Sequence, residues 1–173
     1  MLPGFLIIAY LPAVLDTSGP LVVAAMLAFG CGQVFGTAVV ARLIRWRGAA
    51  LTLVLAACGV TLAAGLLFVT RRVESGEIAA MTALGFAVGI AMVPQQHRMF
   101  ALVPAVAPIA MGLNGSAVYL SVALAAASGG GVLAVAGTAG LIPTAIIIGL
   151  LAVIVSLAVR PERRARREDQ LAA

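Results

Sequence analysis

The chain has 173 residues, of which 63% are hydrophobic and only 10% are charged. A soluble globular domain usually has about a quarter of its residues charged, so this composition excludes a soluble protein and predicts a membrane protein. The 17 charged side chains leave four charge-free runs of 25, 23, 20 and 61 residues, at 17–41, 48–70, 78–97 and 99–159. About 20 apolar residues cross a bilayer once as a helix, so each of the first three runs is long enough for one crossing.

The first predicted segment, residues 1–15, is apolar but short and contains Pro3 and Pro12, so we expect a truncated span there. A secretory signal peptide is the alternative for such a start, but no basic residue precedes Arg42. The next three spans are expected at 20–42, 49–70 and 77–97.

The 61-residue run has to hold two helices and a turn, because one helix of that length would be about 90 Å long. Gly137 and Gly140 mark the predicted turn, since paired glycines interrupt helices and Pro143 follows them. We therefore expect a fifth span at 108–135, a sixth at 141–159 and a basic tail at 161–173. The sequence predicts an all-α, polytopic membrane helix bundle with six transmembrane segments.

Arginines gather on one side of this arrangement. The three in residues 42–47, Arg98 and the five near the C-terminus are separated by even numbers of spans, whereas only Arg71 and Arg72 fall on the other side. The positive-inside rule places the arginine-rich side in the cytoplasm. We expect a multi-pass protein of the cell inner membrane with both termini cytoplasmic, and with three acidic residues facing outward: Asp16, Glu74 and Glu77.

Glycines and a few polar side chains within the spans are candidates for packing or binding, because hydrocarbon penalises unsatisfied polar groups. Two Gly-x-x-x-Gly spacings let helices approach closely. We expect helix packing, with a hinge or pore lining as the alternative, at Gly30, Gly32, Gly36, Gly85, Gly89, Gly129 and Gly130. The candidates for a substrate cavity or gate are Tyr10, Gln33, Gln95, Asn114 and Tyr119.

Individual polar residues have more than one interpretation. Asn114 either bonds to a neighbouring helix or contacts cargo, while Ser116 is expected to return its hydroxyl to its own helix backbone. Cys31 and Cys58 have aliphatic neighbours, so we expect free thiols and no metal site. One histidine and scattered acids do not form the cluster that an enzyme needs, and we expect neither enzymatic activity nor a cofactor. The arginines flank spans, which indicates contact with membrane lipids and not with nucleic acid.

Three short motifs occur in the order found in one transporter family. The first is Tyr10-Leu11-Pro12, the second is Pro94, Gln95, Gln96 and Arg98, and the third is Leu113, Asn114 and Ser116 followed by Gly129-Gly130. In this order they resemble the seventh, tenth and eleventh helices of the major facilitator superfamily, in particular the bacterial drug:proton antiporters and sugar efflux transporters. Two glycines usual in the family's eleventh helix are replaced by Ser121 and Ala125.

A fourth motif resembles the cytoplasmic loop signature of the same family. Gly36, Arg42 and Leu43 fit it, whereas Ala41 stands at a usual glycine and Arg45 at a usual aspartate. By resemblance, a charge-paired gate would use that aspartate. The alternative is that Arg42, Arg45 and Arg47, together with Trp46, only anchor the spans at the headgroups.

The resemblance covers about residues 5–160 and implies half of a twelve-helix transporter fold. It implies an efflux permease that exports small amphipathic molecules or sugars, completed by a missing N-terminal six-helix half or by a second copy. No ionisable residue lies in the middle of a predicted span, so by resemblance proton coupling would belong to the N-terminal half. Met1 falls partway into a family helix, so we expect a fragment or an internal start. An inert fragment and a non-transport membrane scaffold are the alternatives.

Overall fold

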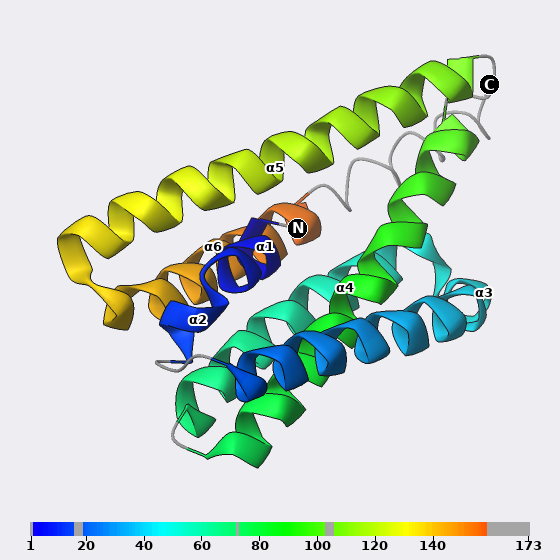
Figure 1. The fold of residues 1–173 in the computed structure, drawn as a ribbon. Helices are drawn as coiled ribbons and strands as arrows, with labels where there is room; N and C mark the ends of the chain where they lie inside the picture. The colour runs from blue at the N-terminus through cyan, green and yellow to red at the C-terminus, as the bar shows by residue number, and fades with distance from the viewer. Residues whose placement is uncertain (1, 16–18, 72, 103–105, 159–173) are drawn as a thin grey trace, which may run out of the picture.

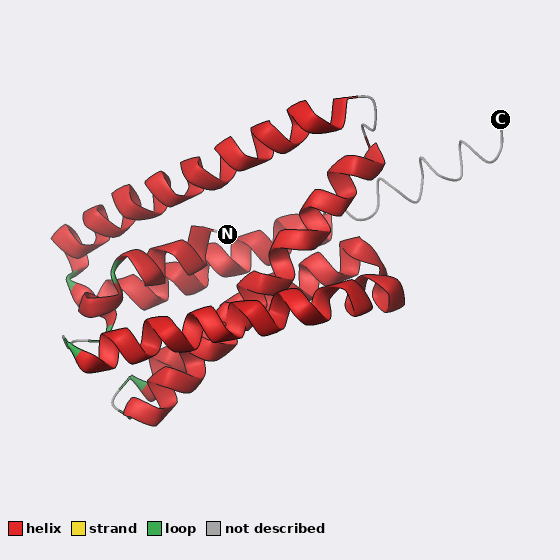
Figure 2. Cartoon of the chain, turned by 45° about the vertical axis from the view of Figure 1, so that its right-hand side comes forward, coloured by secondary structure: helices red, strands yellow, loops and turns green. Residues whose placement is uncertain are grey.

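The computed structural model describes residues 2–15, 19–71, 73–102 and 106–158, with the side chains of 97–102 and 107 excepted. These residues are almost entirely helical, which confirms the all-α prediction (Figures 1 and 2). The elements are α1 (Leu2–Ala9), α2 (Leu11–Val14), α3 (Pro20–Thr70), α4 (Glu74–Leu102), α5 (Ala107–Ala136), the 3-10 helix η2 (Thr138–Gly140) and α6 (Leu141–Ala158). The predicted basic tail, Asp16 and Arg72 lie outside the described residues.

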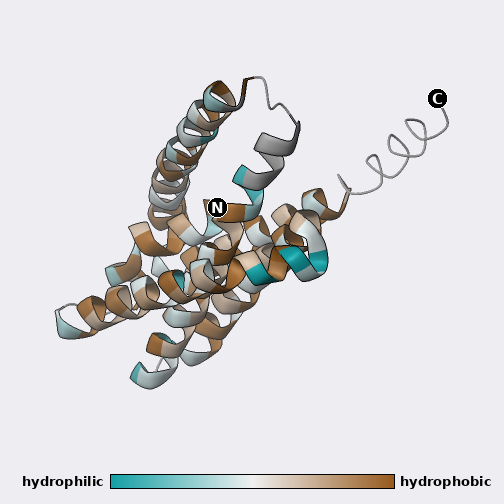
Figure 3. Cartoon of the chain, turned by 90° about the vertical axis from the view of Figure 1, so that its right-hand side faces the viewer, coloured by the Kyte–Doolittle hydropathy of each residue, from teal (hydrophilic) through white to brown (hydrophobic). Residues whose placement is uncertain are grey.

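Four of the described helices are long and apolar enough to cross a membrane. The first is the whole of α3. In α4, in α5 and in η2 with α6, the apolar stretches are, in that order, Glu74–Gln96, Pro108–Ala136 and Thr138–Ala158. Hydrophobic residues cover most of their length, with only a few hydrophilic turns (Figure 3). The helices thus have the length and surface of a membrane protein.

Helix α3 bends back on itself at Gly48, whose φ of 76° and ψ of 159° are not helical. Its two arms, residues 20–47 and 49–70, run in opposite directions, and both pack against α4 (Figure 1). The hydroxyl of Thr52 donates a hydrogen bond to the Gly48 carbonyl oxygen at 2.8 Å, at the start of the second arm. A positive φ of this kind favours glycine, so Gly48 allows the hairpin.

The first arm of α3 is longer than the predicted span at 20–42. Arg42, Arg45 and Arg47 lie in its last turns and are exposed, not in a loop. The physical reason is that neither glycine nor proline occurs between Thr37 and Arg47, so the first helix-breaking residue is Gly48. Arg42 stacks on Trp46 one helical turn later, with 5.6 Å between the guanidinium carbon and the ring centroid.

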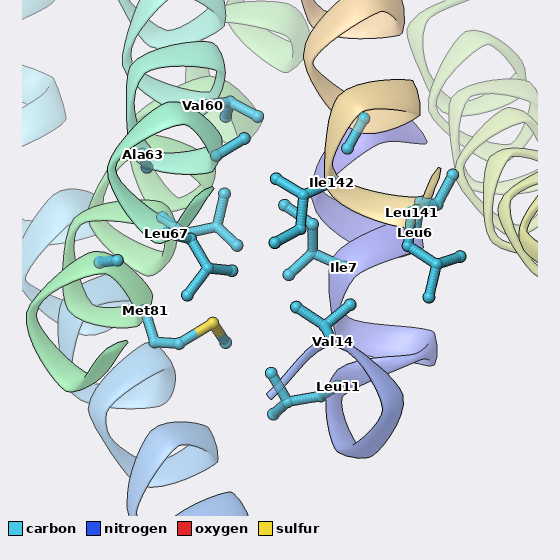
Figure 4. Packing of buried hydrophobic residues seen from close by; sticks show 14 of the residues in the cluster. Leu6, Ile7, Leu11, Val14, Val60, Ala63, Leu67, Met81, Leu141 and Ile142 are labelled. Carbon is cyan, nitrogen blue, oxygen red and sulfur yellow. The ribbon is translucent and has the colours of Figure 1, made fainter. Parts of the chain in front are cut away.

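The N-terminal segment is helical but broken at Tyr10, because Pro12 begins a new helix, α2. Helix α1 packs mainly against α5 and α6, and α6 packs in turn against α3, so that buried residues of all these helices and of α4 meet in one core (Figure 4). Fully or almost fully buried residues of this core include Leu6, Ile7, Leu11, Leu67, Met81, Leu84 and Leu141. Residues from both ends of the sequence thus share one core.

The helix ends fall at two ends of the bundle. The bend of α3, the end of α4 and the start of α5 lie at one end (Figure 1). The turn from α3 to α4 and the break between α5 and α6 lie at the other. At that break Gly137 has a φ of 63° and η2 follows, where the sequence predicts a turn.

Candidate functional site

Two amide side chains join α4 to α5. The Nε2 atom of Gln95 donates a hydrogen bond to Oδ1 of Asn114 at 2.9 Å. Asn114 is buried, with 8% of its surface exposed, and Gln95 is half-buried. This is the interhelical hydrogen bond expected for Asn114, and it brings together two motifs that lie 19 residues apart in the sequence. An interhelical hydrogen bond of this kind helps to fix the relative position of its helices.

A cavity of about 180 Å³ lies beside this pair, between α1, the second arm of α3, α4 and α6. Gln95 forms part of its wall, and Ser156 contributes a hydroxyl from α6. The Ser156 hydroxyl donates to the carbonyl oxygen of Ala152 at 2.7 Å, so its oxygen still has room to accept a hydrogen bond. We call this space the inner cavity; it is mainly apolar, with two polar groups.

Tyr10 lies at the break between α1 and α2 and connects it to α5. Its hydroxyl donates to the carbonyl oxygen of Ala126 at 2.6 Å. Its ring lies where a Cβ atom of Gly129 would be, and its hydroxyl is 3.2 Å from the corresponding position at Gly130. These two glycines therefore make room for an aromatic ring, and Tyr10 packs against a helix instead of lining the inner cavity.

Four glycines form the contact between the first arm of α3 and α4. A Cβ atom on any of them would overlap a backbone carbonyl oxygen of the facing helix: Thr82 for Gly32, Phe86 for Gly36, Phe29 for Gly85 and Gln33 for Gly89. The backbone of each helix thus packs directly against the Gly-x-x-x-Gly pair of the other helix. Such close approach gives the van der Waals contact on which helix association in a bilayer depends.

The structure does not give Gly30 the same role, which corrects the expectation from sequence. A Cβ atom at Gly30 would meet no described atom within 4 Å. The reason is geometric: Gly30 is two residues from Gly32, which at 100° per residue turns it about 200° away from the contact face. Gly30 therefore lies on the side of the helix opposite the packed face.

Two of the cavity candidates lie away from the inner cavity. Tyr119 is 77% exposed on α5, so its side chain does not line a cavity within the described bundle. Gln33 is half-buried at a shallow depression that it shares with Val34, Thr37 and Ala38. Its carbonyl oxygen accepts the Thr37 hydroxyl at 2.9 Å. Of the five candidates, only Gln95 and Asn114 contact each other through their side chains.

Glu77 is more buried than its predicted place at an outward interface suggests. Helix α4 begins at Glu74, so both acids lie in its first turn, and the Glu77 side chain is only 3% exposed. The sequence contained a signal for this burial. Residues 80, 81, 84 and 88 follow Glu77 at the spacing of one helix face, and all are small or apolar and buried. Burial on that face accounts for the position of Glu77.

The chain matches no protein-family model, no curated protein and no solved structure. The resemblance noted above therefore rests on the residues of the motifs. Among the described residues, no three His, Cys, Asp or Glu side chains lie close enough to hold a metal ion. Cys31 is exposed and Cys58 half-buried, and both thiols are free.

The Gln95–Asn114 hydrogen bond can be measured by a double-mutant cycle. We expect Gln95→Leu and Asn114→Leu to be coupled by about 0.6 kcal/mol in the free energy of unfolding, the average for hydrogen bonds between membrane helices, and by no more than about 1.7 kcal/mol. Unfolding of the chain in mixed micelles by sodium dodecyl sulfate, followed by circular dichroism, gives the four free energies. In the control cycle Ser116→Ala replaces Asn114→Leu. Ser116 bonds to the Gly112 carbonyl oxygen of its own helix, so that cycle should be additive. Equal coupling in both cycles would contradict the assignment.

Proposed function

We propose that this chain forms one six-helix half of an efflux permease for small amphipathic molecules or sugars. The observation that carries the proposal is the Gln95–Asn114 hydrogen bond. The motifs around these two residues carry the resemblance to the major facilitator superfamily, and they come from different helices yet meet at a buried polar pair. Polar groups are costly in a membrane interior and commonly occur where a transporter binds or moves its cargo.

The arrangement of the helices supports a six-span count. The two arms of α3 are each longer than 20 residues, α4, α5 and α6 follow, and α1 with α2 forms a short first segment. The exposed arginines of the first arm lie at the same end of the bundle as the end of α4 (Figure 1). The positive-inside rule would make that end cytoplasmic.

The exposed face of α5 supports a second unit. Among its exposed residues are Ile109, Leu113, Tyr119 and Leu120, each more than half exposed. In our proposal a second six-helix unit, a preceding half or another copy, faces this chain and completes the path for the cargo. Alternating access in such transporters needs two repeats that move against each other.

The proposal is tested in the cells that make the protein. Deleting the gene should raise the accumulation of at least one compound in a panel of amphipathic fluorescent dyes and labelled sugars. The chromosomal substitution Asn114→Leu should reproduce most of that rise, because it removes the polar group at the α4–α5 contact. Ser116→Ala, which lies two residues away and bonds only its own helix, should leave accumulation unchanged. Unchanged accumulation of every compound after deletion would refute the proposed function.

A further inference from the structure

The inner cavity is lined by residues of α1, the second arm of α3, α4 and α6. Its walls come from four helices of this one chain. On α6, Gly149 lies close to the second arm of α3: a Cβ atom there would be 2.5 Å from Oγ1 of Thr61. The second arm and α6 therefore pack tightly next to the cavity, and the space is not simply a gap between loosely placed helices.

Small residues create this space. Ala56 and Ala57 on α3, Ala91 on α4, and Gly149 and Ala152 on α6 all line it. Leucine in place of Ala57 or Ala152, which both line the space, would reduce its volume. The cavity is thus a consequence of the sequence, formed where three helices each present small residues.

The volume and chemistry of the cavity define what fits. Its volume of about 180 Å³ is close to that of the roughly 150 Å³ apolar cavity that accepts benzene in a soluble protein. Its described walls contain no charged side chain, and an ion would lose its hydration without gaining a partner. A neutral molecule with one ring therefore matches the inner cavity in size and charge.

The polar groups of the cavity determine which polar group a ligand should have. The hydrogen bond to Asn114 uses one N–H of the Gln95 amide, and its other N–H and its carbonyl oxygen form no hydrogen bond with the described side chains. The Ser156 oxygen can also accept a hydrogen bond. One hydroxyl on the ligand can bond to either residue.

We propose that the inner cavity is a binding site for a small, neutral, single-ring amphiphile with one hydroxyl group, of which a phenol is the simplest case. The site is lined by this one chain and does not depend on the proposed efflux function. A ligand there would contact α4 next to Gln95 and α6 next to Ser156, and so would stabilise the packing of these helices.

Fluorine NMR of 4-fluorophenol with the purified chain in lipid nanodiscs tests the site. A bound signal, distinct from that in empty nanodiscs, is expected for the chain and for Ala158→Leu, a control on the exposed end of α6. Ala152→Leu and Ala57→Leu place the same larger side chain in the cavity and should abolish the signal. A signal that equals that of empty nanodiscs, or that persists in both cavity variants, would overturn the proposal.

A second comparison keeps the test decisive if the cavity variants fail to fold, as judged by circular dichroism. Gln95→Leu should weaken the binding of 4-fluorophenol about five-fold, the effect of one neutral hydrogen bond. It should leave fluorobenzene binding unchanged, because fluorobenzene has no hydroxyl. Equal effects on both compounds would overturn the proposed role of Gln95 in the site.

Discussion

Gly32→Ala is expected to lower the free energy of unfolding by about 1–3 kcal/mol, the usual cost of forcing an extra methyl group into a packed contact. The new Cβ atom would overlap the carbonyl oxygen of Thr82, and it would lie 2.9 Å from the backbone nitrogen of Phe86. Backbone atoms of a helix cannot turn aside as a flexible side chain can. The first arm of α3 and α4 would have to separate, with loss of contact along both glycine pairs.

Gly30→Ala is the matched control for this prediction. It introduces the same methyl group two residues earlier in the same helix, where no described atom lies within 4 Å. Because alanine favours a helix over glycine by about 1 kcal/mol, stability should stay the same or rise slightly. Both free energies are measured by titration with sodium dodecyl sulfate in mixed micelles. Equal destabilisation by the two substitutions would show that the glycine pairs are not the contact between these helices.

Leu6→Ala has the second large expected effect. Leu6 is fully buried in the core shared by α1 and α6 (Figure 4). Truncating it leaves an unfilled space, and we expect a loss of about 2 kcal/mol, the low end for a buried leucine. The low end applies because an undocked leucine in a membrane is surrounded by lipid and not by water. Burying Leu6 therefore gains little hydrophobic transfer energy, and the cost of truncation comes from lost packing contacts.

Leu120→Ala is the control for the core. Leu120 is 60% exposed on α5, so its truncation removes few contacts and should change stability by less than about 0.5 kcal/mol. The same titration applies to both variants. If Leu6→Ala were as mild as Leu120→Ala, the N-terminal segment would not be docked in the core.

Spacing along one helix could be predicted from the sequence, because it depends only on helical geometry. The apolar runs gave the helices, and Gly32, Gly36, Gly85 and Gly89 have the interval that places two glycines on one face. The four-residue interval does not indicate which helix each glycine pair contacts. Gly30 was grouped with them because it is near in sequence, although its direction around the helix is different.

Helix ends and contacts between distant segments were harder to predict. The charge of Arg42, Arg45 and Arg47 suggested a loop, yet charge does not end a helix, and only Gly48 has the backbone conformation that does so. Burial of Glu77 depends on the face of α4 that it occupies. The inner cavity arises from small residues on three helices, and nothing in any single segment marks it.

The hydrogen bond from Tyr10 to Ala126 spans 116 positions in the chain, and this separation has a consequence for synthesis. The arms of α3 and then α4 follow one another directly, so they can pair as soon as each leaves the ribosome. The main partners of α1 are α5 and α6, which are made after α3 and α4. Helix α1 must therefore wait for helices made after α3 and α4, and its docking would follow the pairing of α3 with α4, since contacts between distant segments form late.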